Sequence, residues 1–187
     1  MKYYSTNHQA PAASLEEAVV KGLASDKGLF MPEAIKMLPK EFYDNIEHLS
    51  FQEIAYRVAD AFFGEDVPAD TLKQIVYDTL GFDVPAVKVK DNIYSLELFH
   101  GPTLAFKDVG GRFMARLLGY FIKKEGQKQV NVLVATSGDT GSGQWLPRSG
   151  RYPCVCALSE RKGQRNSGKA VHYAGTEYYG FGSGRYV

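Results

Sequence analysis

Apolar residues recur with a helical period between residues 14 and 80. Two of these stretches begin with a capping box, in which a serine is followed three residues later by glutamate: Ser14-Leu-Glu-Glu17 and Ser50-Phe-Gln-Glu53. The first predicts a short helix that ends at Gly22, because glycine adopts the left-handed conformation of a C-terminal cap. The second predicts a helix that ends at Gly64, and a third helix is expected over Pro68–Leu80. Residues 14–80 are therefore predicted to form a small helical region.

Two stretches around the first predicted helix lack a helical period. Residues 1–13 contain Tyr4-Ser-Thr-Asn7 and Pro11, which predict an extended segment with a turn. Gly28-Leu-Phe-Met-Pro32 is apolar and short, and we expect it to form a loop that packs against the core.

From Val84 onward the period changes to two. Val87-Lys-Val-Lys90 and Ile93–Leu98 alternate around Asp91-Asn92, which predicts a β-hairpin. A helix is expected from Lys107 to about Lys124, followed by a buried strand over Val130–Ala135. A helix, a strand and then a glycine-rich loop form the repeating unit of α/β proteins. The predicted fold class is therefore α/β, with a helical region ahead of an α/β domain.

Composition narrows the class of protein. The hydrophobic content of 44% and charged content of 23% are those of an ordinary globular chain, and a net charge of +1 argues against a nucleic-acid partner. No apolar run approaches the roughly 18–20 residues of a membrane span, and the N-terminus carries no apolar signal segment. We therefore expect a cytoplasmic protein with no membrane partner; composition gives no indication of oligomeric state.

The composition of residues 143–187 differs from that of the preceding chain. This tail holds seven Lys or Arg residues against two acidic residues, and it contains both cysteines and the only tryptophan. Such a shift is typical of a domain boundary or a basic tail. Cys154 and Cys156 are separated by one residue, which fits neither a Cys-x-x-Cys metal site nor an easy disulfide, so we expect no metal site.

Lys107 is the first candidate for chemistry. It follows Pro102 and the apolar Phe99 and Phe106 at a predicted helix start. A lysine that is shielded from water near the positive end of a helix loses part of its preference for the charged form, and becomes a usable nucleophile or base. The alternative is a solvated surface lysine that only begins a helix.

The second candidate is the loop Thr136-Ser-Gly-Asp-Thr-Gly-Ser142, which follows the predicted strand. Its small residues let backbone amides approach a carboxylate or phosphate; an ordinary strand-to-helix turn is the alternative. Asp139 either repels an anion or caps the next helix. Ser137 lacks the Gly-x-Ser-x-Gly frame of a hydrolase. His100, beside a Gly-Pro pair, is an acid/base candidate, a turn cap or a phosphate contact.

Both motifs resemble those of one enzyme family. Leu98-Phe-His-Gly-Pro-Thr-Leu-Ala-Phe-Lys-Asp-Val-Gly-Gly-Arg112 and Thr136–Ser142 are similar to the motifs of threonine synthase, as are Tyr4–Asn7 and Gly22–Pro32. The resemblance covers about residues 1–142. It implies a fold-type II architecture of pyridoxal-phosphate enzymes, with an N-terminal helical region over 1–82 and the beginning of the catalytic domain over 83–142.

The resemblance also implies roles for individual residues. Lys107 would form the Schiff base with pyridoxal 5'-phosphate, and the loop would hold the cofactor and the substrate carboxylate. The implied cofactor-binding residues are Lys107, Ser137, Gly138, Asp139, Thr140 and Gly141. The implied substrate-binding residues are Thr136, Ser137, Thr140, His100 and Thr103. The implied reaction converts O-phosphohomoserine and water to threonine and phosphate, which is carbon–oxygen lyase chemistry.

The resemblance stops after Ser142. Pro147 breaks the helix that the family places there. Back-translating residues 143–187 with one nucleotide dropped permits segments that resemble the family's own continuation. We therefore hypothesise that 143–187 is an out-of-frame tail on a truncated, inactive fragment that lacks the cup for the cofactor phosphate. Another fold-type II lyase or β-replacing enzyme is an alternative, as is a non-catalytic module formed by residues 1–80.

Overall fold

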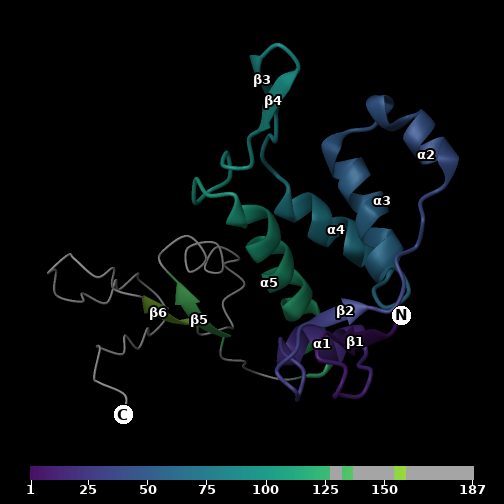
Figure 1. The fold of residues 1–187 in the computed structure, drawn as a ribbon, viewed down its shortest axis with the longest axis vertical. Helices are drawn as coiled ribbons and strands as arrows, with labels where there is room; N and C mark the ends of the chain where they lie inside the picture. The colour runs from purple at the N-terminus through teal and green to yellow at the C-terminus, as the bar shows by residue number, and fades with distance from the viewer. Residues whose placement is uncertain (127–131, 137–153, 159–187) are drawn as a thin grey trace, which may run out of the picture. The chain divides into compact units, whose positions relative to one another are not determined.

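The structure is a computed structural model, and it describes residues 1–126, 132–136 and 154–158 (Figure 1). Helices and three separate two-stranded sheets make up these residues, as the α/β class requires. Within the described ranges, no helix is both long enough and apolar enough to cross a membrane.

The chain divides into two compact units. The first combines Met1–Val84 with Arg116–Phe121, and the second combines Pro85–Ala115 with residues from Ile122 onward. The helix α5 (Lys107–Lys124) crosses these boundaries, so its middle belongs to the first unit and its ends to the second. Lys107 and the turn that precedes it therefore lie in the second unit.

Two short strands pair in the first unit. β1 (Tyr3–Ser5) and β2 (Phe30–Pro32) are antiparallel, with Tyr3 opposite Pro32. The expectation of a packed apolar loop before Pro32 is corrected by this pairing, because β1 supplies hydrogen-bonding partners for the segment. Leu29 and Met31 in that stretch keep 59% and 42% of their surface exposed, so it is no buried plug.

The helix α1 (Leu15–Lys21) begins and ends at the predicted residues. The Ser14 hydroxyl accepts a hydrogen bond from the Glu17 amide at 3.1 Å. The Gly22 amide donates to the Ala18 carbonyl at 3.0 Å with φ of +72°, which closes the last turn. The Glu17 carboxylate pairs with Lys21 rather than completing the capping box.

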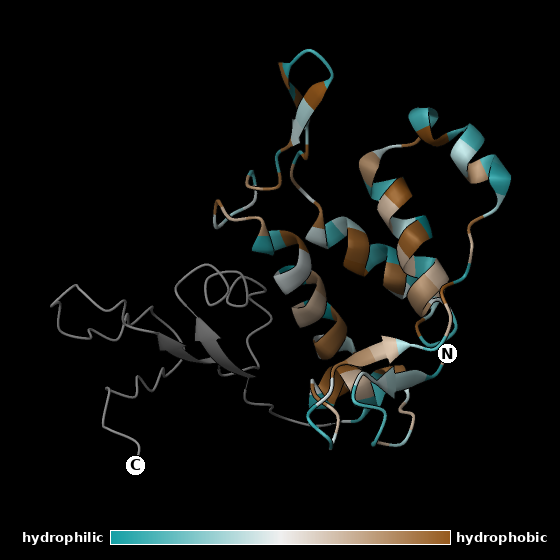
Figure 2. Ribbon diagram, in the orientation of Figure 1, coloured by the Kyte–Doolittle hydropathy of each residue, from teal (hydrophilic) through white to brown (hydrophobic). Residues whose placement is uncertain are grey.

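The core of the first unit forms where α3 (Phe51–Phe63) packs against α4 (Ala69–Thr79). Both helices were predicted, and the Ser50 hydroxyl caps α3 by accepting from the Glu53 amide at 3.2 Å. Figure 2 shows apolar bands along both helices. The buried apolar residues of α3, α4 and the flanking chain are Ala59, Val67, Leu72, Ile75, Val76 and Leu80. Full burial of a valine, leucine or isoleucine side chain stabilises the fold by roughly 1.5–3 kcal/mol.

Two short elements ahead of α3 were not predicted. These are α2 (Lys40–Asp44) and the 3-10 turn η1 (Ile46–His48). Phe42 is the only buried residue of the two elements, so no apolar period marked them in the sequence. The Asn45 side-chain amide donates to the Glu41 carbonyl at 2.8 Å and ends α2.

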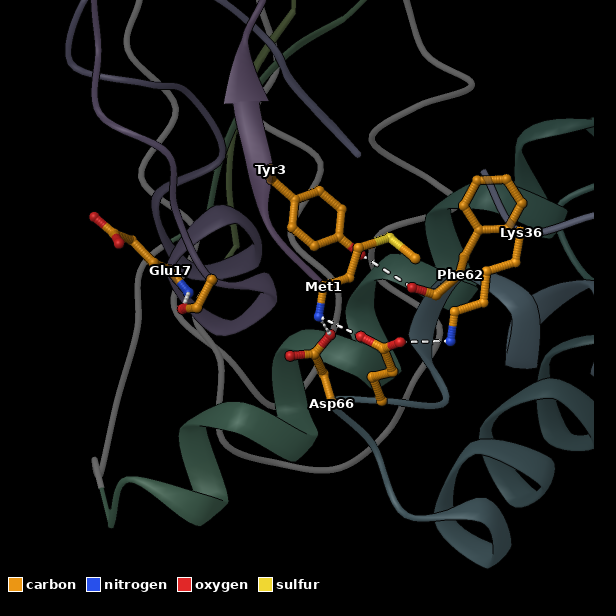
Figure 3. Close-up of polar contacts among 8 residues, drawn as sticks. Met1, Tyr3, Glu17, Lys36, Phe62 and Asp66 are labelled. Atoms are coloured by element: carbon orange, nitrogen blue, oxygen red, sulfur yellow. Dashed lines mark hydrogen bonds and ion pairs between the residues drawn. The ribbon is translucent and has the colours of Figure 1, made fainter. Parts of the chain in front are cut away.

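The amino group of Met1 lies in a cluster of charges (Figure 3). It is 2.9 Å from Glu65 Oε2 and 3.2 Å from Asp66 Oδ2, and Lys36 Nζ lies 2.5 Å from the other oxygen of Glu65. Hydrogen bonds from Lys36 and then from the amino terminus lower the pKa of Glu65 to about 2. The Tyr3 hydroxyl donates to a backbone carbonyl of α3 at 3.2 Å. These contacts tie the start of β1 to the end of α3.

The carboxylate of Asp26 organises the loop after β1. It accepts hydrogen bonds from the Ser5 hydroxyl at 2.6 Å, the amides of Gln9 and Ala10 at 2.9 Å each, and the Gly28 amide at 3.0 Å. The Ser5 bond is the largest cause that lowers the pKa of Asp26 to about 2. Asp26 therefore joins two segments that lie far apart in the sequence.

The second unit contains the predicted hairpin, formed by β3 (Ala86–Lys90) and β4 (Ile93–Leu96). Asp91 takes a φ of +45° in the turn between the strands. Every residue of both strands is exposed, including Val89 at 66% and Ile93 at 62%. The hairpin therefore presents apolar side chains that no described residue covers.

Two further strands of the second unit are parallel. β5 (Val132–Thr136) lies where the sequence predicts a strand, and it pairs with β6 (Cys154–Leu158). β6 lies in the tail and was not predicted. Its residues, Cys-Val-Cys-Ala-Leu, form an apolar run of the kind found in buried parallel strands.

Candidate active site

Lys107 is the first residue of α5 and follows a tight turn. The Leu104 amide donates to the Gly101 carbonyl at 3.0 Å, which closes a four-residue turn with Pro102 at its second position. Leu104 has a φ of +54°, a left-handed conformation that a bulky side chain rarely adopts. Residues in such conformations cluster at functional sites, where the surrounding structure holds them. The turn therefore fixes how the chain enters α5 and where Lys107 lies.

The surroundings of Lys107 include the Phe106 ring. Its side chain is half-buried, and Nζ lies 5.7 Å from the centroid of the Phe106 ring. Phe99 and Phe106 are themselves exposed. Lys107 is thus neither fully buried nor fully exposed among the described residues, and its shielding from water stays a prediction.

Asp108, the next residue, is fully buried. Its Oδ2 accepts a hydrogen bond from the Thr103 amide at 2.8 Å, and its own amide donates to the Ala105 carbonyl at 3.1 Å. The carboxylate thus ties the first turn of α5 back to the preceding turn. Sequence reasoning gave Asp108 no role, because nothing in the motif indicates which way its side chain points.

His100 forms a pair with Glu97. The distance from His100 Nε2 to Glu97 Oε2 is 2.7 Å, and the imidazole stacks on Phe99 with ring centroids 4.8 Å apart. The Glu97 amide donates to the Pro85 carbonyl at 3.0 Å, which anchors the segment beside the hairpin. A carboxylate on one ring nitrogen orients an imidazole and leaves the other nitrogen for a ligand. Glu97 was missed, although its spacing of three residues from His100 is a signal the sequence contains.

Thr103 lies in the turn but presents no accessible hydroxyl. Its Oγ1 is buried and makes no hydrogen bond within the described part of the chain. Thr136 is the last residue of β5. The other predicted loop residues, Ser137, Gly138, Asp139, Thr140 and Gly141, lie outside the described residues, so their roles stay predictions.

The reactive groups near the turn are the Lys107 amine and the His100 imidazole. A primary amine condenses with aldehydes and exchanges protons, and an imidazole exchanges protons near neutral pH. In the described ranges, no three His, Cys, Asp or Glu side chains are grouped so as to hold a metal ion. The arrangement therefore suits amine chemistry on a carbonyl compound.

Comparison with known proteins gives one consistent result. Residues 2–80 match the family model described as the threonine synthase N terminus. Threonine synthase of Escherichia coli is 39% identical over 142 residues, and that of Serratia marcescens is 43% identical over 145 residues. Each match covers 76% of this chain and 32% of the relative. The chain therefore spans about a third of the length of the curated relatives it matches.

Solved structures agree with the sequence comparison. The structure of pyridoxal-phosphate-bound threonine synthase from Brucella melitensis matches with a TM-score of 0.77 and 34% identity, covering 84% of this chain and 35% of that one. Threonine synthase from yeast matches with a TM-score of 0.75 and 34% identity, over the same shares of each chain. The chain is therefore similar to part of these threonine synthases both in sequence and in fold.

Proposed function

We propose that this chain is the N-terminal third of a pyridoxal-phosphate-dependent threonine synthase, and the match of residues 2–80 to the threonine synthase N-terminal family model supports this proposal. The observation that carries the proposal is the place of Lys107, at the first residue of α5 behind a strained turn. The proposed reaction converts O-phosphohomoserine and water to threonine and phosphate.

The residues around Lys107 fit the cofactor. Pyridoxal phosphate carries an aldehyde, and enzymes hold it through a lysine amine. Lys107 is partly exposed and lies behind a turn that the Asp108 carboxylate holds, so an aldehyde has access to a positioned amine. When bound, the cofactor supplies an electron sink for the carbanion of the substrate. The predicted loop from Ser137 to Gly141 would hold the ring of the cofactor.

The chain's own residues would handle protons and bind the substrate. The Lys107 amine would take protons from the α and β carbons and deliver protons to the γ carbon and back to the α carbon. The phosphate would leave from the γ carbon, and water would add at the β carbon. His100, oriented by Glu97, would contact the substrate phosphate. The Thr103 hydroxyl is buried in the closed turn, so its contact with the substrate stays a prediction.

We expect this chain alone to be inactive in turnover, because its match covers only about a third of the length of the threonine synthases that it resembles. The boundaries at residues 82 and 142, the out-of-frame origin of 143–187 and the cytoplasmic location stay predictions. Another fold-type II lyase is disfavoured by the full motif around Lys107. A non-catalytic module is the remaining alternative. The selective reaction of Lys107 with pyridoxal phosphate distinguishes it from our proposal.

The test is selective labelling of Lys107. The full chain is incubated with pyridoxal phosphate and reduced with borohydride, and the pyridoxyl group is mapped by peptide mass spectrometry. We expect Lys107 to be modified in preference to Lys123, an exposed lysine at the other end of the same helix. The visible absorbance of the complex should vanish in Lys107→Ala and persist in Lys123→Ala.

Two results would contradict the proposal. Equal labelling of Lys107 and Lys123 would favour a non-catalytic module whose lysines react only by chance. Absorbance that is unchanged in Lys107→Ala would place the cofactor elsewhere. Turnover of O-phosphohomoserine by the chain would support the family assignment but contradict the expected inactivity.

A further inference from the structure

We propose that Asp108 is the positioning residue of this site: its buried carboxylate holds the turn of residues 101–106 closed and so fixes the Lys107 amine at the start of α5. The inference rests on the proposed function for the meaning of Lys107. Nothing in the sequence motif separates Asp108 from an ordinary acidic residue in the first turn of a helix.

The geometry around the Asp108 carboxylate is that of a clamp. Oδ2 accepts from the Thr103 amide at 2.8 Å, across five residues of chain. The turn inside this loop is closed by the bond from the Leu104 amide to the Gly101 carbonyl. Since Leu104 takes an unfavourable φ of +54°, the turn needs an external tie to stay closed. The Asp108 carboxylate supplies that tie.

Gly101 shows how closely the turn approaches the carboxylate. A Cβ built on Gly101 would lie 2.4 Å from Asp108 Oδ2 and 2.7 Å from its Cβ. Real Cβ atoms do not come this close to another atom, so only glycine permits the approach. Gly101 and Asp108 therefore depend on each other, although seven positions separate them in the sequence.

The clamp is costly in a way that stability alone does not explain. Asp108 Oδ1 is buried without a hydrogen-bond partner in the described part of the chain, and so is the Thr103 hydroxyl. An unpartnered buried carboxylate oxygen destabilises a fold. Groups left unsatisfied in this way are typical of functional sites. We therefore attribute the burial of this carboxylate to its effect on the position of Lys107 and not to a contribution to stability.

The experiment is a double-mutant cycle on the full chain, with Asp108→Ala, Gly101→Ala and the pair of substitutions together. The first readout is hydrogen exchange of the Thr103 amide, which reports closure of the turn without any cofactor. The second is the labelling ratio of Lys107 to Lys123 after pyridoxal phosphate and borohydride. Asp108→Ala should speed exchange of the Thr103 amide and lower the labelling ratio about tenfold, because small displacements of a reacting group cost rates of this order or more.

The remaining variants separate positioning from a general structural role. Gly101→Ala should act like Asp108→Ala, and the double variant should be less impaired than the sum of the two single variants, because Asp108→Ala removes the overlap with Oδ2 although its Cβ remains close to the added methyl group. Asp108→Asn keeps an oxygen that accepts from the Thr103 amide, so it should restore the labelling ratio to within about threefold of the unmodified chain.

The outcomes distinguish this inference from the proposed function. If the unmodified chain labels Lys107 no better than Lys123, the proposed function fails. If Asp108→Ala leaves both Thr103 exchange and the labelling ratio unchanged, the positioning role is overturned while the function stands. Additive effects of Gly101→Ala and Asp108→Ala, or failure of Asp108→Asn to rescue, would also overturn it.

Discussion

Gly28 offers the sharpest test of how the N-terminal unit is built. A Cβ at this position would lie 2.0 Å from Ser5 Oγ and 2.8 Å from the Asn7 amide nitrogen. The Ser5 side chain is fully buried and holds Asp26 through a 2.6 Å hydrogen bond, so it has no room to move aside. The Asn7 contact is with backbone, which moves less easily than a side chain. Gly28→Ala therefore forces β1 away from the loop before β2.

The expected cost follows from this overlap. Overpacking a close-packed site costs typically 1–3 kcal/mol, and we expect the upper end, about 3 kcal/mol, because neither contact of Gly28 can yield. Gly81→Ala is the matched control: the nearest atom to its Cβ is the Tyr77 carbonyl oxygen at 3.9 Å, an ordinary van der Waals distance, and its φ is not positive. We therefore expect Gly81→Ala to change the stability by less than about 1 kcal/mol.

The assay is hydrogen exchange of the β1 and β2 amides in the full chain, which reports opening of the first unit alone. Adding Ser5→Ala to Gly28→Ala removes the 2.0 Å contact, so the double variant should be less destabilised than the sum of the two single variants. Equal losses of stability in Gly28→Ala and Gly81→Ala would refute the reasoning. So would strict additivity with Ser5→Ala.

Two further predictions concern acid and the exposed hairpin. The pKa values of Asp26 and Glu65 are lowered to about 2 in the folded chain, so their contribution to stability is present above their ordinary values, near pH 4, and is lost as the pH falls toward 2. The free energy of unfolding, measured with urea between pH 5 and pH 2, should show this decline. Asp26→Asn should make the free energy of unfolding fall less steeply with pH, and an unchanged dependence on pH would contradict the role of Asp26. The apolar side chains of Val89 and Ile93 should bind an environment-sensitive dye, and replacing both by threonine should reduce its fluorescence where Lys88→Thr does not. Equal fluorescence from all three chains would show that the hairpin does not present an apolar surface.

The sequence predicted the elements whose signals are local. Ser14 and Ser50 cap the helices expected of them, because a cap bonds to an amide only three residues away. The hairpin and α5 also follow from short-range alternation and helical period. Lys107 was placed correctly at a helix start for the same reason, and the resemblance of its motif to that of threonine synthase then predicted pyridoxal phosphate as its partner.

Two features that the sequence did not predict share a physical cause. Each depends on a contact between residues that lie far apart in the sequence. β2 was expected to be a loop, since its pairing partner β1 lies some 27 positions earlier in the register. The four donors to Asp26 come from both sides of α1, and no pattern brings them together.

For Lys107 itself, the sequence determined which residue carries the amine, because residue identity and a helix start are local properties. Only the tertiary structure decided how that amine is held. The burial of Asp108 and the close approach of Gly101 depend on the path of the whole turn. A side chain's direction and its distance from a residue seven positions away become fixed only when the backbone between them has closed.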